Sequence, residues 1–93
     1  MMELVDGRLL VGSPMLMGQA RSLLDAGCER LSNKVATVDL SSVTEVDSSA
    51  LAVMLGWLRF AQARDFQIHF SGVPDNIRSL ADLYGLTEVL PFA

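Results

Sequence analysis

Asp47, Ser48 and Ser49 form the stretch of this sequence whose residue types are best suited to chemistry. Each side chain can accept a hydrogen bond from the unpaired amides of a first helical turn. An anion or a phosphorylated hydroxyl also fits there, because a helix N-terminus carries partial positive charge. These three residues therefore predict the start of a helix at a place that suits a negatively charged group.

Groups suited to catalysis or metal binding are few. Ser48 and His69 are the one conceivable pair of nucleophile and base, and a lone histidine in a strand is usually structural. Asp39, Glu45 and Asp47 cluster around one loop, but EF-hand spacing is missing, and loop solvation with helix capping explains them more simply. The glycines form neither GxGxxG nor GxxxxGK[ST]. We therefore expect a protein that is not an enzyme, with no catalytic residue, metal or cofactor.

Length and composition predict one small domain that spans residues 1–93. The chain is 51% hydrophobic, which is high for its size, so we expect part of the apolar surface to meet a partner. The formal net charge is −4 with no run of lysine or arginine, which argues against nucleic acid as a target. The longest apolar run, residues 50–55, is far below the roughly 18 residues of a membrane span, so we expect no direct membrane insertion.

The centre of the chain predicts a strand followed by an apolar helix. Residues 35–40 are mostly apolar, which suits a central strand covered on both faces. The helix that opens at residues 47–49 and ends near 63–65 has an apolar arc of roughly 220°, whereas one core contact needs about 100°. Either another part of the chain covers the excess, or a partner does.

The remaining elements follow from turn signals and periodicity. Asp6-Gly7 predicts a hairpin between residues 2–5 and 8–11. A helix is expected over residues 14–31, capped by Ser13, with Pro14 at its first position. We also expect a strand over 66–70, a helix over 74–84 that ends at Gly85, and a short edge strand at 89–90. This order predicts an α/β fold with a mixed four- to five-stranded β-sheet packed against three or more α-helices.

The central stretch resembles the main motif of STAS domains, the fold of bacterial anti-sigma factor antagonists and sulfate-transporter tails. The motif has a strand ending in DLS, a loop of the form V-x-x-[VIM]-D, then S/T-[SG]-G-L and an apolar helix, and residues 38–41 and 43–51 match it closely. Ala50 departs from the usual glycine. The tail, with Phe70-Ser71-Gly72-Val73, Tyr84-Gly85-Leu86 and Val89-Leu90-Pro91, is similar to the small STAS subunit of Mla-type phospholipid ABC transporters.

This resemblance implies two alternative functions. The first is a non-catalytic subunit that binds and regulates or stabilises the ATPase of a phospholipid-trafficking ABC transporter that maintains outer-membrane lipid asymmetry. Such a subunit would be cytoplasmic and peripheral to the inner membrane, held there by the transporter complex. The second is an anti-sigma factor antagonist that is released from its kinase partner, the anti-sigma factor, by phosphorylation of Ser48.

Both alternatives make the start of the central helix a docking surface. The residues expected to contact the partner are Asp47, Ser48, Ser49, Ala50, Val53, Trp57 and Phe60. Val53, Trp57 and Phe60 would form an apolar ridge leading away from Ser48, with the aromatic residues as anchors. A ridge of this kind suits a standing complex and favours the transporter subunit.

Overall fold

The computed structural model describes residues 2–12 and 14–92. Its strands are β1 (Met2–Val5), β2 (Arg8–Gly12), β3 (Thr37–Ser42) and β4 (His69–Ser71). Its helices are the single 3₁₀ turn η1 (Met17–Gln19), α1 (Ala20–Arg30), α2 (Ser49–Ala63) and α3 (Asp75–Leu83). The predicted α/β class is confirmed, and the sheet has four strands among the described residues.

The sheet is mixed, with the strand order β1-β2-β3-β4. β1 pairs with β2 antiparallel, whereas β2–β3 and β3–β4 are parallel. The hairpin between β1 and β2 is confirmed, because Asp6 and Gly7 both have positive φ angles, 51° and 77°, as a type I′ turn requires.

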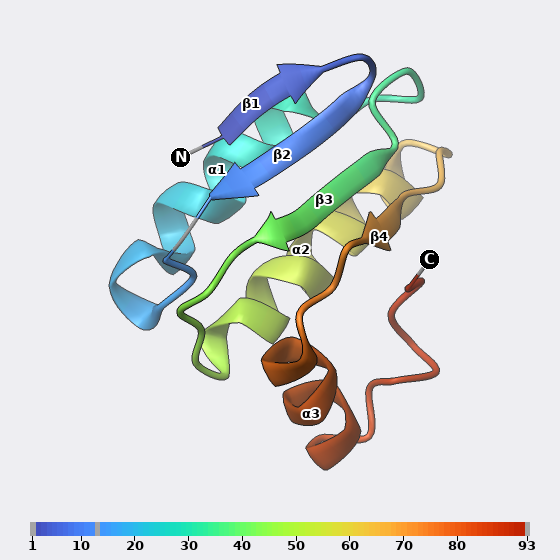
Figure 1. Ribbon diagram of the computed structural model, residues 1–93. Coiled ribbons are helices and arrows are strands. Elements are labelled where there is room, and N and C mark those ends of the chain that lie inside the picture. Colours follow the sequence, from blue (N-terminus) through green and yellow to red (C-terminus); the bar gives the residue numbers. More distant parts are fainter. Residues whose placement is uncertain (1, 13, 93) are drawn as a thin grey trace.

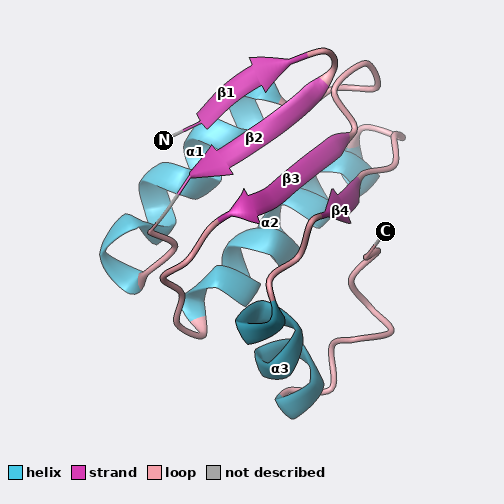
Figure 2. Cartoon of the chain, in the orientation of Figure 1, coloured by secondary structure: helices cyan, strands magenta, loops and turns pink. Residues whose placement is uncertain are grey.

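Helices α1 and α2 cover one face of the sheet, and α3 lies beyond the ends of β3 and β4 (Figure 1; Figure 2). Side chains from the covered face and from α2 form most of the core. They include Leu9, Val11, Val38, Leu40, Phe70, Met54, Trp57 and Ala61, each 0% or 1% exposed.

The prediction that the central strand is covered on both faces is wrong. Val38 and Leu40 point toward the helices and are fully buried. Asp39 and Ser41 alternate with them and therefore lie on the opposite face, where the described chain places no helix (Figure 1). β3 also starts two residues later than expected. Val35 lies in a tight turn, in which its backbone amide donates a hydrogen bond to the Ser32 carbonyl.

The first helix starts later than the sequence pattern predicts. Pro14 does not open a helix; Met15 instead forms a parallel bridge with Val46, with a 2.8 Å bond from the Met15 amide to the Glu45 carbonyl. This pairing keeps residue 15 extended, so helical structure begins only at η1. The expected cap at Ser13 lies outside the described residues.

The last third of the chain follows the predicted order with different bounds. Gly85 ends α3 as expected, with φ +70° and bonds from the amides of Gly85 and Leu86 to the carbonyls of Asp82 and Ala81. β4 is short because Phe66 closes the end of α2, its amide bonding to the Ala61 carbonyl. The expected edge strand at 89–90 is a turn, and Phe92 instead bridges to Phe70.

Candidate functional site

Asp47 joins the start of α2 to the segment that precedes α1. Its Oδ1 accepts bonds from the Ser49 amide, at 2.9 Å, and from the Ser49 hydroxyl. Its Oδ2 accepts the Met17 amide, also at 2.9 Å. The Ser49 hydroxyl and then the Met17 amide lower the pKa of Asp47 below its ordinary value of 3.8, so the carboxylate stays charged. Asp47 is thus the residue that caps α2.

The Ser48 side chain does not cap α2, although the residue stands at the N-cap position. It occupies the N-cap position but has helical backbone angles, φ −62° and ψ −20°, and makes no capping bond through its side chain. The residue is exposed. Its hydroxyl is therefore presented at the surface, beside a helix N-terminus at which the Asp47 carboxylate already accepts the Ser49 amide.

An apolar hollow of about 250 Å³ adjoins Ser48 between α2 and the end of α3. It is lined by Ser48, Leu51, Ala52, Leu55, Tyr84 and Leu86. Tyr84 is 56% exposed, and its neighbour Leu83 is 75% exposed. The turn at Gly85, which ends α3, brings Tyr84 and Leu86 to this place. The structure thus places apolar side chains along one side of an exposed hydroxyl.

The expected apolar ridge along α2 is wrong, because most of it lies in the core. Trp57 is 0% exposed and its indole Nε1 donates to the Leu24 carbonyl of α1 at 3.2 Å. Val53 and Ala50, at 3% and 0% exposure, are buried as well. Because the sheet covers one side of the apolar arc and α1 another, the chain itself hides what was expected to face a partner.

Phe60 is half-buried at the far end of α2. Its ring packs edge-on against Phe66 with centroids 6.4 Å apart, and the Arg64 guanidinium stacks over it at 3.9 Å. At 1.5 Å per residue, Phe60 lies about 18 Å along the helix from Ser48. The structure therefore brings Asp47, Ser48 and Ser49 together but leaves Phe60 outside their surface.

Sequence reasoning missed Met17, Tyr84 and the hollow beside Ser48. Tyr84 belongs to the Tyr84-Gly85-Leu86 segment, which predicts the end of a helix and contributes to the family resemblance but was not assigned to the partner surface. A glycine that ends a helix commonly brings the residue after it back against the last helical turn, so a position for Leu86 near the end of this helix could have been predicted. Met17 carried no such signal, because the pattern placed it within a continuous helix.

His69 and Ser48 are not brought together. His69 pairs with Thr37 at the first residue of β3, whereas Ser48 follows the loop beyond the last residue of β3. Six strand residues separate these ends by about 17 Å. The geometry offers no base for the Ser48 hydroxyl at this histidine.

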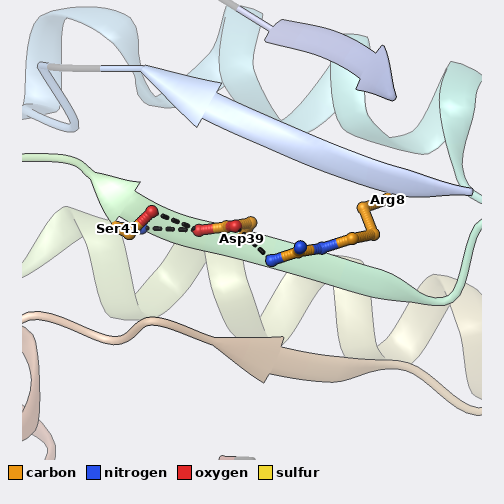
Figure 3. Close-up of polar contacts among 3 residues, drawn as sticks. All are labelled: Arg8, Asp39 and Ser41. Atoms are coloured by element: carbon orange, nitrogen blue, oxygen red, sulfur yellow. Dashed lines mark hydrogen bonds and ion pairs between the residues drawn. The ribbon is translucent and has the colours of Figure 1, made fainter. Parts of the chain in front are cut away.

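Asp39 is used within the fold. Its Oδ1 accepts the Ser41 amide at 2.9 Å and the Ser41 hydroxyl at 2.6 Å, and its Oδ2 pairs with the Arg8 guanidinium (Figure 3). The Ser41 hydroxyl is the largest cause that lowers the pKa of Asp39.

Among residues 2–12 and 14–92, no three His, Cys, Asp or Glu side chains are grouped as a metal site requires. Within the same residues no helix has the length and apolarity to cross a bilayer.

Comparison with known proteins gives the family. A family model described as "Mlab, STAS domain" matches residues 2–91. The intermembrane phospholipid transport system binding protein MlaB of Escherichia coli (strain K12) is 36% identical over 58 residues, which cover 61% of this chain and 60% of that protein. The MlaB protein of Shigella flexneri matches equally. The match therefore spans less than two thirds of the length of these relatives.

Solved structures agree with the fold. A Thermotoga maritima protein assigned as an anti-sigma factor antagonist has a TM-score of 0.74 at 16% identity, covering 98% of this chain and 82% of its own. The anti-sigma factor antagonist SpoIIAA in its unphosphorylated form has a TM-score of 0.71 at 14% identity, covering 100% of this chain and 86% of its own. From the mixed sheet, the motif around Asp47 and Ser48 and the family match over residues 2–91, we conclude that this chain belongs to the STAS-domain family of the MlaB type.

Proposed function

We propose that this chain is a non-catalytic STAS subunit, formed by residues 1–93 as one domain, that binds the ATPase of a phospholipid ABC transporter. The observation that carries the proposal is the exposed Ser48 hydroxyl beside an apolar hollow at the start of α2. A surface of this composition suits a lasting protein contact, since apolar side chains supply the buried area and a hydroxyl supplies a specific hydrogen bond. The relatives named as phospholipid transport binding proteins support the choice of partner.

The proposed role is to bind and stabilise the ATPase and so regulate transport. The chain would work in the cytoplasm, held at the inner membrane by the transporter complex. Docking through the Ser48 surface would leave the polar face of the sheet, opposite the helices, outside the contact. On that face Asp39 is bonded to Arg8 and to Ser41.

A second candidate function is that of an anti-sigma factor antagonist. The observation in its favour is again Ser48, because an exposed hydroxyl free of capping bonds is accessible to a kinase. Phosphorylation would place a charge of roughly −1.5 to −2 beside Asp47 and disfavour a partner that buries this surface. The apolar surroundings of Ser48 favour the transporter subunit over this alternative.

Co-purification separates the two candidates. The chain is co-expressed with a tagged ATPase from the phospholipid ABC transporter of the same organism and, separately, with a tagged anti-sigma kinase. We expect a stable complex with the ATPase through size-exclusion chromatography and no phosphate on Ser48 by mass spectrometry. A complex with the kinase alone, dissolved by ATP as Ser48 becomes phosphorylated, would contradict the transporter assignment.

A further inference from the structure

Met17 is among the most exposed large apolar side chains that the structure describes, at 74% exposure. It belongs to the single turn η1, and none of the three residues of this turn is buried. An exposed methionine on so short a segment gains little for the fold, because its side chain remains in water.

The backbone around Met17 is nevertheless fixed. The Met17 amide donates to Asp47 Oδ2 at 2.9 Å. Two residues earlier, Met15 is bridged to Val46, with bonds of 2.8 Å to the Glu45 carbonyl and 3.3 Å from the Asp47 amide. These bonds fix the backbone from which an exposed apolar side chain projects, so its attachment point is preorganised as expected of an interface residue.

The Met17 segment is continuous with the Ser48 surface. Asp47 directly precedes Ser48 and binds the Met17 amide, and Ser48 in turn lines the hollow with Tyr84. Figure 1 shows the segment before α1, the start of α2 and α3 at the same end of the molecule. The Met17 backbone is therefore tied to the residue next to Ser48, at the same end of the molecule as the hollow.

We propose that Met17 is a contact residue for the ATPase that docks at Ser48, and that Asp47 is the positioning residue that presents it. The inference rests on the proposed function and adds a third element, η1, to the surface formed by α2 and α3. The flexible thioether side chain of methionine suits a shallow apolar patch on the partner, because it can adapt its shape to that patch. Asp47 uses both of its oxygens within the chain, since three donors from Met17 and Ser49 bond to them.

The test measures ATPase binding by calorimetry for four forms of the chain. Met17→Gln keeps the length of the side chain and removes its apolar character, so we expect the Kd to rise about tenfold. Met17→Leu keeps the apolar character and should stay within about threefold of the parent. Leu4→Gln is the matched control, because Leu4 is also exposed, at 53%, but lies on β1; its Kd should equal that of the parent.

A double variant tests the positioning role of Asp47. Asp47→Asn replaces one acceptor oxygen with a donor, so the Met17 amide or the Ser49 groups lose their partner. If Asp47 acts through Met17, Asp47→Asn should speed hydrogen exchange of the Met17 amide, and adding Met17→Gln should not weaken binding further. Losses that multiply in the double variant would contradict the positioning role.

The outcomes distinguish this inference from the proposed function. If the parent chain does not bind the ATPase, the proposed function fails. If the parent binds and Met17→Gln binds equally well, the function stands and the role of Met17 is wrong. Unchanged ATPase binding with altered self-association in sedimentation, or altered binding to phospholipid vesicles, would show that Met17 meets a second copy or a lipid surface and would overturn the inference.

Discussion

The indole ring of Trp57 lies directly against the backbone of Gly27. A methyl group added at position 27 would stand 2.1 Å from the indole Nε1 and 2.4 Å from Cε2. The Trp57 Nε1–H also donates to the Leu24 carbonyl one turn earlier on α1. This contact lets α1 and α2 approach closely and places the only tryptophan in the core.

Gly27→Ala should therefore lower the free energy of unfolding by about 1–3 kcal/mol. The added methyl group would overlap the indole ring, so the packing between α1 and α2 has to shift. The gain in helix propensity from alanine, about 1 kcal/mol, is too small to offset such a clash. Urea denaturation measures the change. Gly18→Ala is the control, since a methyl group at that position meets no atom within 4 Å. Equal stability of Gly27→Ala and the parent would show that this packing is wrong.

Ser48 and Asp47 should differ in their effect on stability. Asp47→Ala removes the cap of α2 and the bond to the Met17 amide, so we expect a loss of about 1–2 kcal/mol. Ser48→Ala removes an exposed hydroxyl without a capping bond and should stay within about 0.5 kcal/mol of the parent. Chemical denaturation of both variants gives the comparison. A loss for Ser48→Ala as large as that for Asp47→Ala would restore Ser48 as the cap.

Asp39 should make stability depend on pH in the acid range. Its pKa in the folded chain is lowered from 3.8, so its contribution is fully present above about pH 5 and is lost as the pH falls through the folded value. Unfolding free energies between about pH 5 and pH 2 should fall more steeply for the parent than for Asp39→Asn. Ser41→Ala removes the largest cause of the shift, so the folded pKa of Asp39 lies closer to 3.8 and this variant should lose less stability over this pH range than the parent.

An equal slope for the parent and Asp39→Asn would contradict this account of Asp39. The variant Ser41→Ala provides the internal control, since it keeps both Asp39 and its pairing with Arg8. In folded Ser41→Ala the pKa of Asp39, measured by NMR of the carboxyl group, should lie above its value in the parent.

Local signals allowed much of the fold to be predicted. Asp6-Gly7 predicted the hairpin because a type I′ turn needs two positive φ angles, and Gly85 predicted the end of α3 for a similar reason. The motif at Asp47 and Ser48 predicted both the start of α2 and the family. In each case the required conformation depends on a few neighbouring residues.

Long-range contacts explain what could not be predicted. The apolar arc of α2 shows how much surface must be covered, but not whether α1 or a partner covers it, so Trp57 was expected at the surface. The late start of the first helix depends on the bridge between Met15 and Val46, which are distant in the sequence. The hollow beside Ser48 likewise depends on how α3 packs near α2.

The docking surface at Ser48 is the central claim, and binding of the purified ATPase to the parent, Ser48→Thr and Ser48→Asp chains tests it most directly. Ser48→Thr keeps the hydroxyl and should bind within about threefold of the parent. Ser48→Asp brings a charge to a desolvated contact and should raise the Kd about tenfold or more. Thermal melts should show that all three chains are equally folded, since aspartate is favourable at a helix N-terminus. If Ser48→Asp melts like the parent and binds the ATPase with the same Kd, the partner does not dock at Ser48.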